Sequence, residues 1–174
     1  LNLVSTTVGW RMTNPIYPAP WVESLGRSAE IVAESLGITR DEQDNWANRS
    51  HELAADAWEA GFHDGFVEPV GTVLRDESIR DTDVQQLARL RPAFSPDGTV
   101  TAGNSSPIND GAVATLIGRR EWADDLGVEP LGKIVASAVV GIQPDRFAVA
   151  PVDAINKLLQ QTGHQLSDIA VVDI

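Results

Sequence analysis

Residues 130–174 alternate two apolar runs with one amphipathic segment, and this order constrains the fold more than any other feature. The runs "LGKIVASAVVG" and "DIAVVDI" have the continuous apolar character of buried strands. Between them, "PVDAINKLLQQTG" has helical spacing, with Pro151 in its first turn and Gly163 at its end. Strand, helix, strand units build mostly parallel sheets covered by helices, so we predict an α/β fold.

The segment before these residues favours helices. Residues 39–61 place Thr39 and Glu42 at the spacing of a capping box, and apolar residues then recur at helical spacing up to Gly61. Three shorter helices are expected with their own caps or stops: 26–37 ending at Gly37, 81–90 capped by Asp81 or Thr82, and 119–127 ending at Gly127. Strands are predicted where apolar or β-branched residues run together: 67–80, 99–103 and 111–118. Residues 1–24, rich in proline, are expected to form an irregular loop.

The stretch "PDGTVTAGNSSPINDGAVATL" (96–116) is polar and rich in small residues, although it leads directly into an apolar run. Small residues let a ligand lie against the backbone, and hydroxyl and amide groups can hydrogen-bond it. A plain loop entering a strand explains the same pattern. Both interpretations stay open at this point.

Charge and composition exclude several classes of function. The net charge of −12 and the absence of a Lys/Arg stripe argue against nucleic-acid binding. The chain has no cysteine, so disulfides, thiolate metal sites and a cysteine nucleophile are excluded within it. No apolar run reaches the length of a membrane span, no metal site is predicted, and a cytoplasmic protein is expected. The three histidines, His51, His63 and His164, are interpreted as surface residues.

Three stretches, "GITRDEQDNWA", "RSHELAADAWEAGF" and "LARLRPAFSPDGTVTAGNSSPINDGAVA", follow one another along the chain. Together they resemble the middle of a thiolase, an acyl-CoA acyltransferase. The resemblance extends from "SLGRSAE" to the end of the sequence. Because Leu1 is not a start residue and the chain ends in an apolar run, we expect it to be a central fragment of a longer polypeptide.

The resemblance implies a thiolase-like α/β fold, in which two similar halves form five layers, αβαβα, and an inserted loop domain covers coenzyme A. It implies that residues 1–108 form most of the α-rich loop domain. Residues 109–129 would then end the N-terminal half, and residues 130–174 would begin the C-terminal half. The chain would thus combine loop-domain helices with some strands of the sheets.

The resemblance also implies an acyl-CoA C-acyltransferase of fatty acid metabolism, which cleaves 3-ketoacyl-CoA or condenses two acyl-CoAs. Coenzyme A and acyl-CoA would be substrates, with no permanently bound cofactor. The family's catalytic cysteines and histidine fall outside this chain, so no catalytic residue is assigned and the segment alone is expected to be inactive. Expected partners are the missing segments of the same polypeptide and further copies, in a homodimer or homotetramer. The alternative is a non-catalytic thiolase-like protein that binds acyl-CoA or acts as a scaffold.

Five residues are candidate coenzyme A contacts on the strength of the resemblance. Arg80 in "ESIRD" matches an arginine near the adenine nucleotide and 3′-phosphate, which would be a charge-assisted contact. Ser106 in "NSSPIND" matches a serine that hydrogen-bonds the pantetheine, and Leu25 in "SLGRS" matches an apolar residue lining that arm. Ser24 falls where some members carry a histidine, and Phe147 where many have methionine near the acyl pocket.

Each main candidate also has a purely structural explanation. Arg80 could be a solvated turn residue and Ser106 a turn former. Leu25 and Phe147 could be ordinary core residues. Pro107 replaces a glycine that is common in the family, which leaves the geometry of the loop after Ser106 open.

Overall fold

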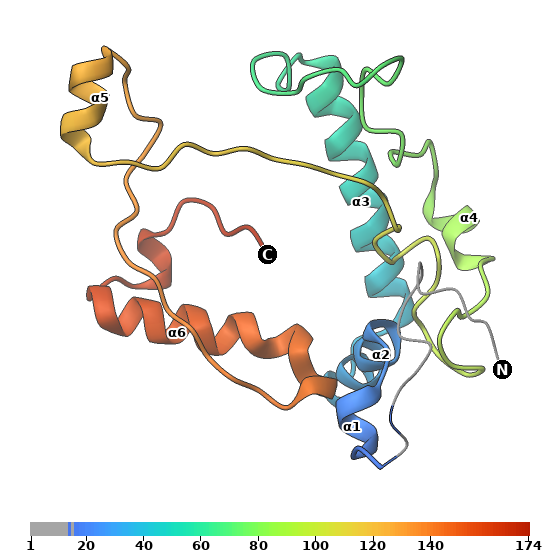
Figure 1. Cartoon of the computed structure of the whole chain (residues 1–174). Coiled ribbons are helices and arrows are strands. Elements are labelled where there is room, and N and C mark those ends of the chain that lie inside the picture. Colours follow the sequence, from blue (N-terminus) through green and yellow to red (C-terminus); the bar gives the residue numbers. More distant parts are fainter. Residues whose placement is uncertain (1–13, 15) are drawn as a thin grey trace, which may run out of the picture. The chain divides into compact units, whose positions relative to one another are not determined.

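The computed structural model describes Asn14 and residues 16–174 (Figure 1). This part of the chain divides into two compact units. The first comprises the described residues up to Pro107 together with Gln143–Ala148, and the second comprises Ile108–Ile142 and Val149–Ile174. The beginning of the loop predicted over residues 1–24, and of the domain predicted over 1–108, lies outside the described residues.

The two longest helices predicted in the first unit are confirmed. Helix α2 (Leu25–Leu36) stops at Gly37, whose φ of 66° is the left-handed conformation that glycine adopts without strain. Helix α3 (Arg40–Glu59) begins at the predicted capping box. There the Glu42 backbone N–H donates to Thr39 Oγ1 at 3.2 Å, and the Thr39 backbone N–H donates to Glu42 Oε2 at 2.8 Å.

A short helix, α1 (Ala19–Val22), forms inside the segment that we predicted to be irregular. The prediction is wrong at these residues because Pro20 lies in the first turn of the helix. The backbone N–H groups of a first turn have no partner within the helix, so the missing N–H of proline costs nothing there.

Helix α4 (Val84–Ala88) is shorter than predicted and starts later, so the predicted caps Asp81 and Thr82 are wrong. The N-cap is Asp83, whose Oδ1 accepts from the Gln86 backbone N–H at 2.7 Å. Its Oδ2 accepts from the Gln86 side-chain amide at 3.0 Å. Two bonds to one residue three positions ahead explain why the helix starts here and not earlier.

The predicted strands are absent from the described residues, where only isolated β-bridges form: the predictions concerned 67–80, 99–103, 111–118, 131–141 and 168–174. A helix makes its hydrogen bonds within one segment, whereas a strand exists only when another segment supplies its partners. An apolar run therefore predicts where a strand could be buried, not that it will pair. The helices of the α/β prediction are observed, and its sheet stays a prediction.

A tight turn occupies part of the first predicted strand. Val70 and Val73 each donate a backbone N–H to the other's carbonyl at 3.0 Å, around Gly71 and Thr72. Gly71 has a φ of 61°, which suits the first central position of a two-residue hairpin turn. The chain reverses here instead of continuing as an extended strand.

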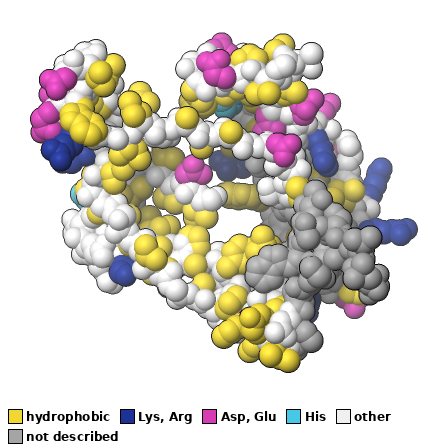
Figure 2. Space-filling view, in the orientation of Figure 1, with side chains coloured by type: hydrophobic (Ala, Val, Ile, Leu, Met, Phe, Trp, Pro, Cys, Tyr) yellow, Lys and Arg dark blue, Asp and Glu magenta, His cyan; other side chains and the backbone are white. Residues whose placement is uncertain are grey.

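The second unit contains α5 (Arg120–Leu126), α6 (Ala150–Thr162) and the short 3-10 helix η2 (Leu166–Asp168). Helices α5 and α6 confirm the two helices that the sequence predicted to end at Gly127 and Gly163. No residue of this unit is fully buried, and Val113 in one run predicted as a strand is 92% exposed. Apolar side chains accordingly reach the visible surface at many places (Figure 2).

The buried core of the described residues lies in the first unit, where α4 packs against α3 (Figure 1). Its fully buried apolar side chains come from α2, α4 and the segment after α4: Val32, Ala33, Leu87 and Val100. Polar side chains of α2, α3 and the segment after α4 are buried beside them: Ser28, Glu30, Asp44 and Thr101. Buried polar groups need hydrogen-bond partners, so their bonds fix how the segments of this core lie against one another.

Candidate functional site

Helix α3 supports the returning segment between Arg75 and Leu90, which is attached to it near both ends. The Arg75 guanidinium lies over the Trp58 ring, 5.8 Å from the ring centroid. At the other end, Arg40 Nη2 donates to the carbonyls of Leu87 at 2.7 Å and Leu90 at 3.0 Å. The Leu87 carbonyl belongs to the last turn of α4, so a cation at this position also interacts favourably with the helix dipole.

Arg80, the predicted 3′-phosphate contact, lies between these two attachments. Its backbone N–H donates to His51 Nδ1 at 3.2 Å, while its side chain is exposed and pairs with no described residue. Just before it, Asp76 Oδ1 accepts from the Ser78 hydroxyl at 2.6 Å and the Ser78 N–H at 2.8 Å. These two bonds, the hydroxyl bond first, lower the pKa of Asp76. The backbone at Arg80 is thus held, while its guanidinium makes no hydrogen bond or ion pair with the described residues.

A buried carboxylate of α2 holds the segment that follows α4. Glu30, only 6% exposed, accepts from the backbone N–H groups of Thr99 and Val100 at 2.9 Å, and from the Thr99 hydroxyl at 3.1 Å. A Cβ at Gly98 would collide with this carboxylate, so the close approach requires glycine there. Glu30 therefore fixes the start of the polar stretch noted in the sequence.

The Asn104 side chain joins the same stretch to α3. Its Nδ2 donates to Asp44 Oδ1 and to the Thr99 carbonyl, both at 3.0 Å, and its Oδ1 accepts from the Thr101 N–H at 2.7 Å. Asp44 is 1% exposed, and its other oxygen accepts from Arg40 Nε at 2.8 Å. The buried charge is therefore paired, as its burial requires.

Ser106, the predicted pantetheine contact, directly follows this network. Thr101 Oγ1 accepts from the N–H groups of Gly103 at 3.1 Å and Asn104 at 3.3 Å. The Ser105 hydroxyl donates to the Thr101 carbonyl at 2.6 Å. The turn is closed up to Ser105, while Ser106 is exposed and its hydroxyl has no hydrogen-bond partner among the described residues.

Ser24 and Leu25 lie at the N-terminus of α2. Ser24 is the N-cap, and its hydroxyl accepts from the Arg27 N–H at 3.2 Å, which gives it a structural role already. Leu25 is 70% exposed. The alternative explanation, that Leu25 is an ordinary core residue, is therefore wrong. Leu25 is open to an apolar ligand.

Phe147 lies in the 3-10 helix η1 (Pro144–Val149), in the segment that packs with the first unit. Its ring is 40% exposed and so only partly packed. All five predicted contact residues therefore belong to the first unit. The described hydrogen bonds link none of the five to another, but they tie the segments of Arg80 and Ser106 to the same helix, α3.

Of the three histidines interpreted as surface residues, His51 and His63 are half-buried and contact other residues, whereas His164 is exposed. His51 is half-buried and bonded to Arg80, and the His63 ring packs 4.4 Å from the Trp58 ring. His51 had no partner at helical spacing because its partner lies 29 residues away in the sequence. Glu30 carried a weak sequence signal, since it interrupts the apolar side of α2 beside Val32 and Ala33.

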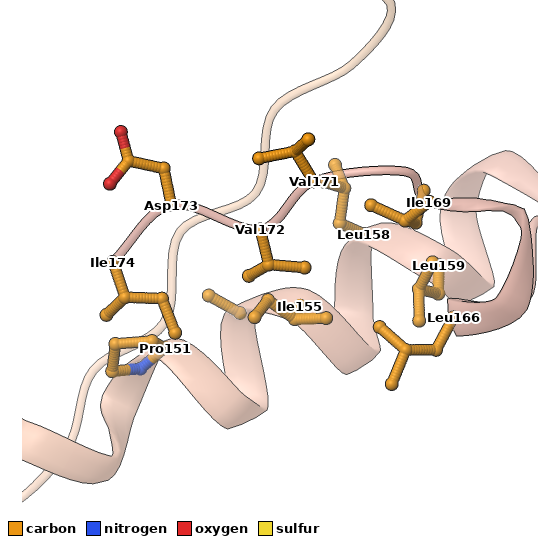
Figure 3. Close-up of a pocket in the computed structure, with 11 residues that line it drawn as sticks. Pro151, Ile155, Leu158, Leu159, Leu166, Ile169, Val171, Val172, Asp173 and Ile174 are labelled. Carbon is orange, nitrogen blue, oxygen red and sulfur yellow. The ribbon is translucent and has the colours of Figure 1, made fainter. Parts of the chain in front are cut away.

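Two hollows lie on the separate units. The first unit has one of about 350 Å³ beside Asn104, lined also by Ile38, Glu42, Gln43 and Trp46. The second has an apolar one of about 400 Å³ between α6 and the C-terminal segment, where Val172 lies over Ile155 and Asp173 points away (Figure 3). Within the described residues, no group of His, Asp and Glu side chains could hold a metal ion. None of the described helices combines the length and the hydrophobicity that a membrane span requires.

Comparison with known proteins places these residues in context. The family model "Thiolase, N-terminal domain" matches residues 16–121. The chain is 35% identical to the beta-ketoadipyl-CoA thiolase of Pseudomonas putida over 184 residues, covering 100% of this chain and 46% of that protein. It is 42% identical to the 3-ketoacyl-CoA thiolase of Bacillus subtilis over 169 residues, covering 87% of this chain and 43% of that protein.

A solved structure agrees with the sequence comparisons. The crystal structure of the Bacillus anthracis acetyl-CoA acetyltransferase matches with a TM-score of 0.76 and 32% sequence identity, covering 98% of this chain and 48% of that one. The chain therefore spans less than half the length of these relatives.

Proposed function

The chain belongs to the thiolase family, and from this premise we propose that it forms the coenzyme A-contacting part of an acyl-CoA C-acyltransferase. The reaction would be cleavage of 3-ketoacyl-CoA by coenzyme A, or condensation of two acyl-CoAs. Arg80 would contact the 3′-phosphate, and Ser106 and Leu25 the pantetheine arm. Ser24 would cap α2 beside that arm, and Phe147 would lie near the acyl group.

The observation that carries this proposal is that two segments presenting free polar groups are held on one helix. His51 of α3 bonds the backbone of Arg80, and Asp44 of α3 bonds Asn104, two residues before Ser106. The backbone is fixed at both places, while the guanidinium of Arg80 and the hydroxyl of Ser106 have no partner in the described residues. Because the backbone at these polar groups is already fixed, ligand binding loses less conformational entropy there.

The experiment compares coenzyme A with 3′-dephospho-coenzyme A. We expect Arg80→Ala in the full-length protein to weaken binding of coenzyme A by about 1.5 to 3 kcal/mol, the range for a hydrogen bond to a charged group. Arg80→Ala should barely change the binding of the dephospho compound. The control Arg119→Ala should leave the affinities for both compounds nearly unchanged. Isothermal titration calorimetry measures the six dissociation constants, for both ligands with the wild type and the two variants. An unchanged affinity of Arg80→Ala for coenzyme A would refute the contact.

The chemical step is proposed to come from outside these 174 residues. Acyl transfer through a thioester needs a thiolate, a base and donors for the oxyanion. The chain contains no cysteine, so the segment alone should show no thiolysis of acetoacetyl-CoA, whereas the full-length protein should turn it over. Thiolysis by the segment alone, abolished in Ser106→Ala, would contradict this division. A full-length protein that binds coenzyme A without turnover would instead indicate a non-catalytic relative.

The architecture and setting of the whole protein are proposed from the same family membership. Residues 1–108 would form most of the loop domain, 109–129 the end of the N-terminal half and 130–174 the start of the C-terminal half. The complete protein would be a cytoplasmic homodimer or homotetramer acting in fatty acid metabolism. Light scattering of the full-length protein tests the oligomer.

A further inference from the structure

We propose that His51 is a positioning residue for Arg80, and that its neutral imidazole sets the place from which the Arg80 guanidinium reaches a 3′-phosphate. This inference rests on the proposed function, because it assigns His51 a role in binding the phosphate of coenzyme A. It follows from the single hydrogen bond between the Arg80 backbone and His51 Nδ1.

That bond is the only one that links residues 76–82 to another element in the part of the chain that the structure describes. Within this stretch, the other hydrogen bonds are those between Asp76 and Ser78, which are local. The neighbouring attachments to α3 are made by Arg75 before it and by the end of α4 after it. Without the bond to His51, no described hydrogen bond would tie the backbone of Arg80 to α3 between these two attachments.

The geometry assigns which imidazole nitrogen accepts the bond. The Arg80 N–H is a donor, so Nδ1 must offer a lone pair, and the proton of the neutral ring lies on Nε2. His51 is half-buried on α3, in the middle of a long helix, and so gives the bond a rigid base. A flexible arginine side chain loses less entropy on binding when its own backbone is already fixed.

The chain allows the acceptor to be separated from the packing of the side chain. In asparagine, Oδ1 is as many bonds from the backbone as Nδ1 is in histidine, so His51→Asn keeps an acceptor at that place. His51→Leu introduces an apolar side chain of similar reach that offers no acceptor. His164→Leu removes an exposed histidine of the second unit and is the matched control.

The test is the affinity of the full-length protein for coenzyme A and for 3′-dephospho-coenzyme A. We expect His51→Leu to weaken coenzyme A binding about fivefold, the effect of one ordinary hydrogen bond, with little change for the dephospho compound. His51→Asn should recover most of the loss, and His164→Leu should match the wild type. A merely structural role would weaken both ligands alike and would overturn the proposal.

The outcome separates this inference from the proposed function. If Arg80→Ala weakens coenzyme A binding but His51→Leu does not, the role of His51 is wrong and the phosphate contact stands. If Arg80→Ala has no effect, the phosphate contact itself is wrong, and the positioning role falls with it. Failure of His51→Asn to recover binding that His51→Leu has lost would also count against the acceptor role.

Discussion

At the scale of the residue, Asn104 connects the polar stretch to α3 through three hydrogen bonds. Its amide satisfies the buried Asp44 carboxylate, the Thr99 carbonyl and the Thr101 N–H at once. A buried polar group that loses its partner costs more free energy than the bond had contributed, because it is left without water. Asn104 should therefore be among the least replaceable side chains of the first unit.

We predict that Asn104→Leu lowers the free energy of unfolding of the first unit by about 1 to 3 kcal/mol, because it leaves buried groups unpaired. Asn109→Leu, which changes an exposed asparagine of the second unit, is the control and should have little effect. Urea unfolding, followed by tryptophan fluorescence, measures both variants. Equal stability of Asn104→Leu and the control would show that the network contributes little.

Gly103 gives a second prediction at this scale. A Cβ there would lie 2.5 Å from Leu90 Cδ1 and 2.6 Å from Leu87 Cδ2, and Leu87 is only 3% exposed. Gly103→Ala should thus destabilise the first unit by about 1 to 3 kcal/mol through overpacking. At Gly132 a Cβ meets nothing within 4 Å, so Gly132→Ala should be tolerated. Matching melting temperatures for the two variants would contradict the crowding.

At the scale of the element, the start of α3 should depend on pH. The Thr39 backbone N–H, and then its hydroxyl, donate to the Glu42 carboxylate and lower its pKa. A lowered pKa in the folded state stabilises the protein above the unfolded pKa, and this stability is lost as the pH falls through the folded pKa. Glu42→Gln should therefore be less stable than the wild type at neutral pH, with the difference shrinking in acid.

Thermal unfolding between neutral pH and pH values below the usual pKa of glutamate, about 4.3, measures this difference. Glu34→Gln serves as the control, because its exposed carboxylate makes no hydrogen bond in the described residues. A difference between Glu42→Gln and the wild type that stays constant with pH would show that the charged cap contributes nothing.

The elements that could be predicted from the sequence are those whose signals are local. Thr39 and Glu42 cap α3 from three residues apart, and Gly37 stops α2 where the sequence indicated. The start of α4 was missed because three successive residues could each cap a helix. Strands could not be settled, because their pairing depends on other segments.

The same distinction applies to the candidate site. Family resemblance supplied the contact residues, but not the groups that hold them in place. Glu30 reaches Thr99 across 69 residues, and Asn104 reaches Asp44 across 60. No periodic or spaced pattern encodes contacts at such separations, so the network became visible only in three dimensions.

At the scale of the whole molecule, the two units differ in what stabilises them. Every fully buried side chain of the described residues belongs to the first unit. In the second, the C-terminal segment lies over the apolar side of α6, as Figure 3 shows for Ile155 and Val172, but no side chain there is fully buried. Since stability comes mainly from apolar burial, the units should not unfold together in the isolated 174-residue chain.

Hydrogen exchange of that chain should separate α3 from α6. Helix α3 has 20 residues and is tied to α4 and to the polar stretch, so its central amides should exchange slowly. Helix α6 has 13 residues, close to the length at which a helix without tertiary support is only marginally stable, about 12 to 15 residues, and its amides should exchange much faster. Mass spectrometry of peptides from both helices, after matched labelling times, measures the contrast. If the amides of α6 were as well protected as those of α3, the second unit would be more stable than its exposed side chains explain. That result would overturn the proposed difference in stability between the two units.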